Sequence, residues 1–425
     1  MSGMDAPEGI GWGAVRIYIW HGYLLTGTGS NEYSQALART LARQGHDVTV
    51  FCQDPQPPEL PGVSVVRPEL PGRMPVFVLD RYADAVPALL GDMDPAELDA
   101  YVAANVAAIR ACGPADLLIT NHLLMGGPVG AASGLPFVVK AHGSELEFAM
   151  RGEAGLCSWA EETLAPAAAV IAGSRHIESV IDDLLDLPRG KVHVIPPGVD
   201  TEQMRPRSRA GALQGLLAEA ASDAPNGGDE RRPDDGNAEL FRQFFADPSR
   251  CSVLYVGKIS EEKGVPLLLD AVSDLDVDTL IVGFGPLRRV LEEHCGDRVF
   301  FTGPLQHRHL RYLWPLVDVS VVPSVFPEAF GMVAAEAASC ACPPLVADQT
   351  GLAEIAAGLR RFYPDRFAEL PAFVSGDVSS LTEKIAANIA LSAPVRREVG
   401  EAARAAVEAL WSWDSVARRI TALVE

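Results

Sequence analysis

The chain has 425 residues, of which 48% are hydrophobic, and a formal net charge of −21 at pH 7. This length predicts two domains rather than one core, and the charge excludes a protein that meets nucleic acid through a basic face. No apolar run reaches the ~18–20 residues of a membrane span. We therefore expect neither a nucleic-acid partner nor a strong membrane signal.

The first residues and the cysteines indicate the cellular compartment. The start, MSGMDAPEGIGWGAVR, lacks the basic and apolar regions of a signal peptide. The seven cysteines are odd in number and scattered, as is typical of free thiols in a reducing cytosol. We expect a cytoplasmic protein. The sequence has neither zinc-type spacings nor a calcium-loop pattern, so no metal site is predicted.

The first half alternates short apolar strands with helices. Its strand-like segments are rich in Val and Ile and show little polar alternation, which is typical of strands buried on both faces. The first helix has a capped start at Ser30 and Asn31 and a core stripe at Leu37 and Leu41. Strands are expected at 16–20, 47–51, 63–67, 116–120, 137–141, 169–172 and 192–195, and helices at 32–44, 94–112 and 174–187. Strand and helix in alternation predict a doubly wound parallel sheet.

Residues 221–237 (ASDAPNGGDERRPDDGN) interrupt this pattern. They are polar and rich in Gly, Pro and Asp, which predicts a disordered insertion. The alternation then resumes, and it predicts a second parallel sheet. Its strands are expected at 253–256, 279–282, 299–302, 319–322, 344–347 and 372–375.

Two carboxylates follow the strand at 319–322. Glu328 and Glu336 are eight positions apart, so Glu328 precedes a helix and Glu336 lies on it, roughly on the same side. Free amides at the helix start can hold an anion while the two carboxylates accept hydrogen bonds from hydroxyls. A sugar attached to a diphosphate has this chemistry. The alternative for the pair is a capping acid followed by a solvated glutamate.

The stretch from 323 to 354 resembles the E-x7-E signature of retaining family 4 glycosyltransferases. The resemblance covers nearly all of the chain outside 1–13 and 205–245. It implies the GT-B fold, an α/β architecture of two Rossmann-like, doubly wound parallel-sheet domains with an interdomain cleft. The acceptor domain would be 1–200 and the nucleotide-sugar donor domain 201–410, with the last helix, 411–425, packing back on the first domain.

Two lysines lie at the turn after the strand at 253–256. Lys258 and Lys263 follow Gly257, and both can reach one diphosphate where this loop meets the next helix. Without further evidence, two lysines at a turn would be interpreted as solvated surface charges. The resemblance implies a catalytic role for both, together with Glu328. The family usually has Arg at position 258, and Lys keeps the charge but loses the bidentate fork.

His142 follows the apolar run FVVKA and matches the family's cleft histidine, although a single histidine is more often structural. The resemblance assigns it a catalytic place beside the transferred sugar. It assigns Glu336 to the ribose hydroxyls and Glu328 to the sugar hydroxyls. The implied donor-binding residues are Gly27, Gly29, Gly257, Gly283, Gly285, Val299, Phe300, Ala329, Phe330, Gly331, Met332, Val333 and Glu336. The first of these loops departs from the family, because its two glycines are split by Thr28.

The resulting hypothesis is a metal-independent retaining glycosyltransferase without a cofactor. It would move a hexose from a nucleoside diphosphate sugar, UDP- in preference to GDP-, to an acceptor hydroxyl. Two alternatives stay open: a sugar-nucleotide epimerase or phosphorylase on the same fold, and a non-catalytic protein that binds nucleotide sugars. Product identity separates them, since an epimerase returns an isomeric donor.

Overall fold

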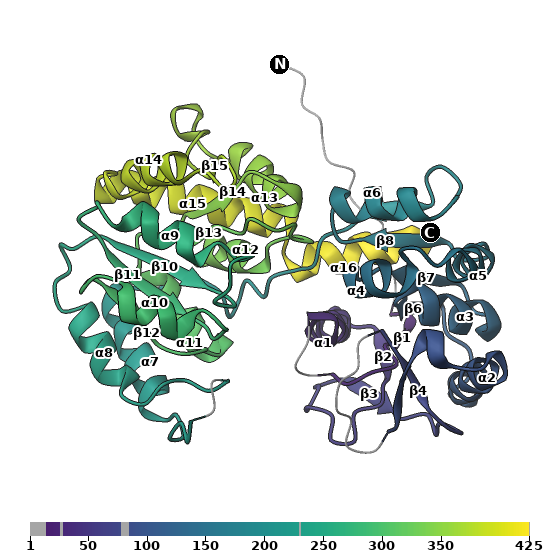
Figure 1. Ribbon diagram of the computed structural model, residues 1–425. Coiled ribbons are helices and arrows are strands. Elements are labelled where there is room, and N and C mark those ends of the chain that lie inside the picture. Colours follow the sequence, from purple (N-terminus) through teal and green to yellow (C-terminus); the bar gives the residue numbers. More distant parts are fainter. Residues whose placement is uncertain (1–13, 26–28, 78–84, 229–230, 425) are drawn as a thin grey trace. The chain divides into compact units, whose positions relative to one another are not determined.

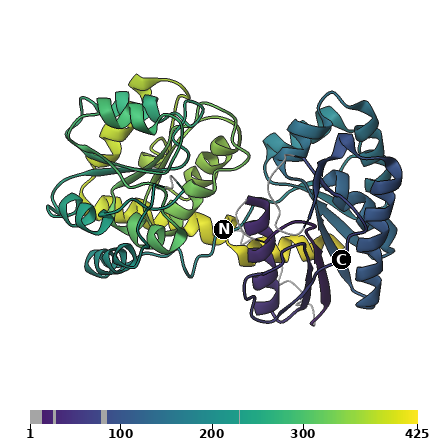
Figure 2. The same ribbon diagram turned by 60° about the horizontal axis from the view of Figure 1, so that its bottom comes forward.

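The computed structural model describes residues 14–25, 29–77, 85–228 and 231–424 (Figure 1). The chain divides into two compact units. The first unit comprises Met1–Gly173, Ile177–Ile195 and Ala417–Glu425, and the second comprises Ser174–His176 and Pro196–Val416. Each unit contains a parallel sheet with helices on both faces, as the turned view in Figure 2 also shows.

The sheet of the first unit has seven parallel strands in the order β3-β2-β1-β6-β7-β8-β9. Its strands are β1 (Arg16–Trp20), β2 (Asp47–Phe51), β3 (Val63–Val66), β6 (Leu117–Asn121), β7 (Phe137–Lys140), β8 (Ala169–Ala172) and β9 (Val192–Val194). The order reverses between β1 and β6, which are neighbours with Ile17 opposite Leu117. In open α/β sheets ligands bind beyond the carboxyl ends of the strands at such a switch point.

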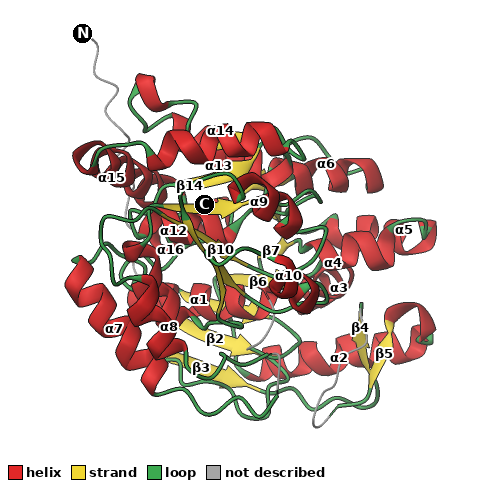
Figure 3. Cartoon of the chain, turned by 60° about the vertical axis from the view of Figure 1, so that its left-hand side comes forward, coloured by secondary structure: helices red, strands yellow, loops and turns green. Residues whose placement is uncertain are grey.

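Helices and a small second sheet complete the first unit. The helices are α1 (Gly29–Arg43), α2 (Pro95–Ala111), α3 (Leu123–Ser133), α4 (Gly143–Glu145), α5 (Ala154–Leu164) and most of α6 (Arg175–Leu184), with short turns η1 (Leu90–Asp92) and η2 (Leu146–Met150). Asp94 begins α2 with a capping box. Strands β4 (Met74–Val76) and β5 (Pro87–Leu89), which the sequence did not predict, pair in parallel beside α2 (Figure 3).

The sheet of the second unit has six parallel strands in the order β12-β11-β10-β13-β14-β15. Its strands are β10 (Ser252–Val256), β11 (Asp278–Val282), β12 (Val299–Phe301), β13 (Val319–Val322), β14 (Pro344–Ala347) and β15 (Ala372–Phe373). The order reverses between β10 and β13, so this is the switch point of the second sheet. Both sheets are doubly wound and parallel, as the sequence predicted.

The second unit is richer in helices. They are α7 (Arg209–Ala221), α8 (Asn237–Phe244), α9 (Val265–Val272), α10 (Arg288–His294), α11 (His307–Leu313), α12 (Met332–Ser339), α13 (Thr350–Arg360), α14 (Val378–Ile389) and α15 (Ala393–Leu410), with turns η3 (Trp314–Leu316) and η4 (Asp365–Phe367). The chain ends in α16 (Trp413–Thr421) and η5 (Ala422–Val424). From Ala417 onward it belongs to the first unit, where Arg419 donates to the Val194 carbonyl at 2.6 Å. Of the helices within the described ranges, none combines the length and apolar character that crossing a bilayer requires.

The structure describes most of the segment 221–237, which the sequence predicted as a disordered insertion. Ala221 ends α7 and Asn237 begins α8. Between them Asp223 pairs with Arg308, and Asp234 pairs with Arg288. The prediction considered only how little apolar area this composition can bury, whereas ion pairs and backbone hydrogen bonds hold the segment. Residues 229–230 lie outside the described residues.

Candidate active site

Glycines shape the carboxyl edge of the second sheet. Gly257 follows β10 and donates to the Val282 carbonyl at 3.0 Å, and Gly283 follows β11 and donates to the Gly303 carbonyl at 3.0 Å. A Cβ on Gly283 would lie 1.8 Å from the Gly257 carbonyl oxygen, and one on Gly285 would lie 2.2 Å from the carbonyl oxygen of Ile259. The backbones of neighbouring strand exits are therefore in direct contact at this edge.

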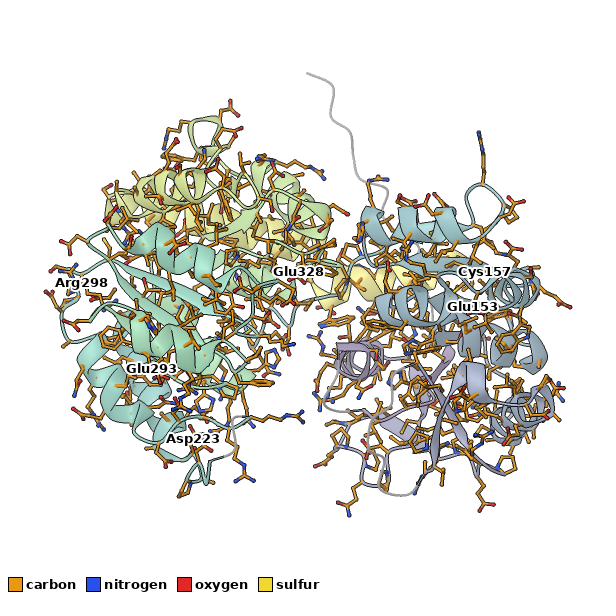
Figure 4. All side chains as sticks on the ribbon, viewed as in Figure 1. Glu153, Cys157, Asp223, Glu293, Arg298 and Glu328 are labelled. Carbon is orange, nitrogen blue, oxygen red and sulfur yellow. The ribbon has the colours of Figure 1, made fainter. Side chains whose placement is uncertain are left out.

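A lysine and a glutamate meet at the switch point of this sheet. Lys263, in the loop after β10, donates from Nζ to Glu328 Oε1 at 2.5 Å, and Ser324, after β13, donates to the same oxygen at 2.7 Å. The Glu328 side chain is 20% exposed and that of Lys263 is 36% exposed, so the pair remains within reach of a ligand. Figure 4 labels Glu328. Lys258 is exposed, and its carbonyl accepts from the Tyr255 hydroxyl at 2.7 Å.

The start of α13 supports the loop that carries Glu328. The Glu328 amide donates to Thr350 Oγ1 at 3.0 Å, and the Gly351 amide donates to the Glu328 carbonyl at 3.0 Å. Thr350 has φ +45°, an uncommon conformation for a β-branched residue. The predicted placement is confirmed: Glu328 lies in the loop before α12, and Glu336 lies on it.

Glu336 is buried and has a partner that the sequence did not reveal. Its Oε1 lies 3.1 Å from Nε2 of His307, the first residue of α11. The Glu336 residue is 8% exposed, whereas the His307 side chain is 60% exposed. The only sequence signal for His307 was its position shortly after the strand at 299–302. A carboxylate and an imidazole together can hold a pair of vicinal hydroxyls.

The remaining predicted donor residues differ in what they expose. Phe330 is buried, with its ring 5.9 Å from that of Trp411, so its backbone rather than its ring can face a ligand. The Phe300 ring packs edge-on against Phe244. Residues of the same predicted set that are half-buried or exposed are Val299, Ala329, Gly331, Met332 and Val333. Their contact with a donor stays a prediction.

In the first unit the switch point gathers three histidines. His21 follows β1, His122 follows β6 and His142 follows shortly after β7. The rings of His122 and His142 are 4.7 Å apart, and those of His21 and His122 are 6.2 Å apart. The sequence singled out only His142. The other two could have been found because each comes directly after a strand at the point where the strand order reverses.

Buried polar partners orient these rings. His142 Nε2 lies 2.8 Å from Asn121 Oδ1, and His122 Nδ1 lies 3.0 Å from Glu145 Oε2. Glu145 also accepts from the His142 amide at 2.7 Å. Burial lowers the pKa of His21 to about 3 and lowers the pKa of His142 well below its usual range. Both rings are therefore neutral at pH 7, and a neutral imidazole offers one donor and one acceptor, which suits hydroxyls.

The first glycine loop is only partly visible. Gly27 lies outside the described residues. Gly29 begins α1, and a Cβ there would meet nothing within 4 Å. Packing therefore does not require glycine at position 29, and its predicted role toward a donor stays a prediction. Within the described part of the chain, no three His, Cys, Asp or Glu side chains are grouped so that they could hold a metal ion.

Lys140 beside this cluster predicts a pH effect on stability. It is 3% exposed, and its Nζ donates to the Ala141 carbonyl at 3.2 Å. Burial lowers the pKa of Lys140 to about 7, against an opposing contribution from Glu145. The unfolded chain, with an ordinary lysine pKa of ~10.4, binds more protons between about pH 7 and pH 10, so stability rises with pH across this window.

Lys140→Met should abolish that rise. The variant should be more stable than the parent at pH 7, by on the order of a few kcal/mol, with the gain shrinking toward pH 10. Urea unfolding at pH 7, 8, 9 and 10, monitored through a probe in the first unit, measures the free energy of unfolding of variant and parent. Lys384→Met, in α14 of the second unit, is the control for loss of a lysine elsewhere. A difference between Lys140→Met and the parent that does not change with pH would contradict the assignment.

Two units, each built on a doubly wound parallel sheet, are the architecture of GT-B glycosyltransferases. Two family models match the chain: Glycosyltransferase Family 4 over residues 27–203 and Glycosyl transferases group 1 over residues 250–388. The protein belongs to the family 4 glycosyltransferases and is a transferase enzyme.

Relatives among curated proteins agree with this family. The chain is 26% identical over 347 residues to the D-inositol 3-phosphate glycosyltransferase of Xylanimonas cellulosilytica, with 76% of each chain covered. It is 28% identical to the enzyme of the same name from Salinispora tropica, with 76% of this chain and 67% of the relative covered. A shorter match, 34% over 121 residues, is to a GDP-mannose-dependent alpha-(1-6)-phosphatidylinositol dimannoside mannosyltransferase of Mycobacterium tuberculosis, covering 27% of this chain and 32% of the relative.

Solved structures share the fold. Sucrose-phosphate synthase from Thermosynechococcus elongatus superposes with a TM-score of 0.65 at 22% identity, covering 96% of this chain and 98% of that one. Anabaena HepE in complex with UDP also gives a TM-score of 0.65, at 16% identity, covering 96% of this chain and 99% of that one.

Proposed function

We propose that this glycosyltransferase moves a hexose from a nucleoside diphosphate sugar, with UDP-hexoses first, to an acceptor hydroxyl with retention of configuration and without a metal ion. The observation that carries the proposal is the Lys263–Glu328 pair at the switch point of the second sheet, at 2.5 Å. A cation beside a carboxylate suits a ligand with a diphosphate and a sugar side by side. The structural neighbour solved with UDP supports the choice of donor.

The residues of the second unit divide the donor between them. Lys258 and Lys263 would stabilise the negative charge that grows on the diphosphate as the glycosidic bond breaks. Glu328 would accept hydrogen bonds from the sugar hydroxyls, and Glu336 with His307 would hold the ribose hydroxyls. The amides of 329–331 would hold the sugar or its phosphate. The acceptor oxygen bonds to the anomeric carbon on the face that the diphosphate leaves, and its proton passes to a diphosphate oxygen, so no covalent nucleophile is required.

The acceptor and the transferred sugar would meet the first unit at His142, which is half-buried, whereas His21 is fully buried and both of its ring nitrogens have partners in Asn31 and Ser34. The His142 imidazole is neutral at pH 7, which suits hydroxyls rather than an anion. His142 would contact the transferred sugar. The names of the curated relatives make a cyclic polyol phosphate, D-inositol 3-phosphate, the first acceptor to test.

Incubation with UDP- and GDP-hexoses and a panel of hydroxyl acceptors tests this function. We expect free UDP or GDP, a new glycoside whose anomeric proton shows retained configuration by NMR, and unchanged rates in EDTA. An isomeric donor without free nucleotide would replace the proposal with an epimerase. Release of no nucleotide from any donor, by protein shown to be folded, would overturn it.

A further inference from the structure

We call residues 222–228 and 231–237 the strap. Both ends of the strap form ion pairs with other residues of the second unit. At one end Asp223 pairs with Arg308 and lies 3.1 Å from Nε2 of His309, both in α11. Figure 4 labels Asp223. At the other end Asp234 pairs with Arg288 at the start of α10 and donates its amide to the Thr302 carbonyl at 2.9 Å. The strap thus joins α10, the exit of β12 and α11, and Figure 1 shows it beside α11.

The exit of β12 is shaped to receive the strap. A Cβ on Gly303 would lie 2.6 Å from Asp234 Oδ1 and 2.9 Å from the Arg232 carbonyl oxygen, so the strap fills the space of the missing side chain. Asn237 is 3% exposed and donates from Nδ2 to the Thr302 carbonyl at 2.9 Å. Its Oδ1 is buried without a partner among the described residues. A buried carbonyl oxygen that lacks a donor costs free energy until a donor reaches it.

The strap contacts α11 and the exit of β12, the two elements that carry His307 and the predicted donor residues Val299 and Phe300. Asp223 contacts Arg308 and His309, the two residues that follow His307. His307 in turn lies 3.1 Å from Glu336, the proposed ribose carboxylate. Asp234 lies at the exits of β11 and β12 through Arg288 and Thr302. With the diphosphate at Lys258 and Lys263 and the ribose at Glu336, the base would extend toward these exits.

We propose, on the basis of that function, that the strap is a wall of the nucleoside site and selects the base. Two of its groups keep acceptor capacity: the Asp234 carboxylate, although Arg288 engages both of its oxygens, and the unpartnered Asn237 carbonyl. Acceptors favour a base whose Watson–Crick edge carries a ring N–H, as in uracil and guanine. Adenine presents a ring-nitrogen lone pair at that position, so only its exocyclic amine can donate to such acceptors. The strap therefore discriminates against ADP-sugars.

Calorimetric titration of the full chain with UDP, GDP, ADP and pyrophosphate tests the strap. We expect the parent to bind UDP or GDP at least about tenfold more tightly than ADP. Asp234→Asn and Asn237→Ala should each reduce this ratio several-fold and leave pyrophosphate affinity unchanged. The matched control is Glu293→Gln, which removes the exposed Arg289–Glu293 pair of the same helix α10 and should behave as the parent (Figure 4).

The possible outcomes distinguish a failure of the strap inference from a failure of the proposed function. Parent-like base ratios in both strap variants would overturn the strap inference and leave the proposed function intact. A parent protein that binds none of the three nucleotides would overturn both. If Asp234→Asn does not fold, the base ratio of Asn237→Ala decides, because that variant removes the other acceptor of the strap. Lowered pyrophosphate affinity in the strap variants would also count against a role confined to the base.

Discussion

Lys263→Ala should lower turnover by roughly 10²-fold while the protein stays folded. The diphosphate gains negative charge as the glycosidic bond breaks, so a cation beside it stabilises the transition state more than the bound donor. The structure places this cation against Glu328, with the Lys263 Nζ–Glu328 Oε1 distance at 2.5 Å. The variant therefore also leaves the carboxylate without its cation, in a half-buried position that repels the diphosphate.

Steady-state kinetics with the best donor of the panel measures this effect, as a fall in kcat that exceeds the rise in KM. Glu336→Gln is the contrasting variant. It should mainly weaken donor binding, because ribose hydroxyls keep their charge during the reaction. Glu328→Ala should impair both parameters, since it contacts the sugar whose anomeric carbon becomes cationic. Unchanged turnover in folded Lys263→Ala would show that the diphosphate lies elsewhere.

Gly264→Ala should destabilise the second unit severely. Gly264 joins the lysine loop to α9 with φ +70°, and a Cβ there would lie 1.9 Å from the Pro323 carbonyl oxygen at the end of β13. Neither backbone can yield without disturbing the contact between the exits of β10 and β13. Strain in the left-handed region and the steric overlap together should cost on the order of several kcal/mol.

Thermal unfolding of parent and variant, with and without donor nucleotide, measures this loss. Gly296→Ala is the matched control in the same unit, because a Cβ there meets nothing within 4 Å and the residue has no positive φ. It should unfold as the parent does. Since Gly264 adjoins Lys263, any folded fraction of Gly264→Ala should also bind nucleotide weakly. Parent-like stability of Gly264→Ala would mean that the β10–β13 contact is not as described.

Much of the fold could be predicted from local pattern. The strands at 16–20, 47–51, 319–322 and 344–347 have the bounds expected from their apolar runs. Parallel strands covered on both faces are continuous Val/Ile-rich segments, so their positions are evident without knowledge of their neighbours. The pair β4 and β5 was missed because three-residue strands are too short to show a period.

The candidate site could be predicted only where one segment contained it. Glu328 and Glu336 lie on a loop and the helix that follows it, so helical spacing sufficed to relate them. The contacts of the strap could not be predicted, because its partners lie elsewhere in the chain: Asp223 pairs with Arg308, 85 positions away, and Asp234 pairs with Arg288, 54 positions away. A composition that buries little apolar area does not reveal such partners.

The sequence by itself determined the two parallel sheets, their strand positions and the residues that follow each strand. These features depend on period and on turn chemistry, which act between near neighbours in the chain. Only the tertiary structure decided which of those residues meet: Lys263 with Glu328 across 65 positions, His307 with Glu336 across 29, and His122 with Glu145 across 23. Strand order determines these contacts, because the carboxyl ends of parallel strands lie at one edge of the sheet whatever their separation in sequence.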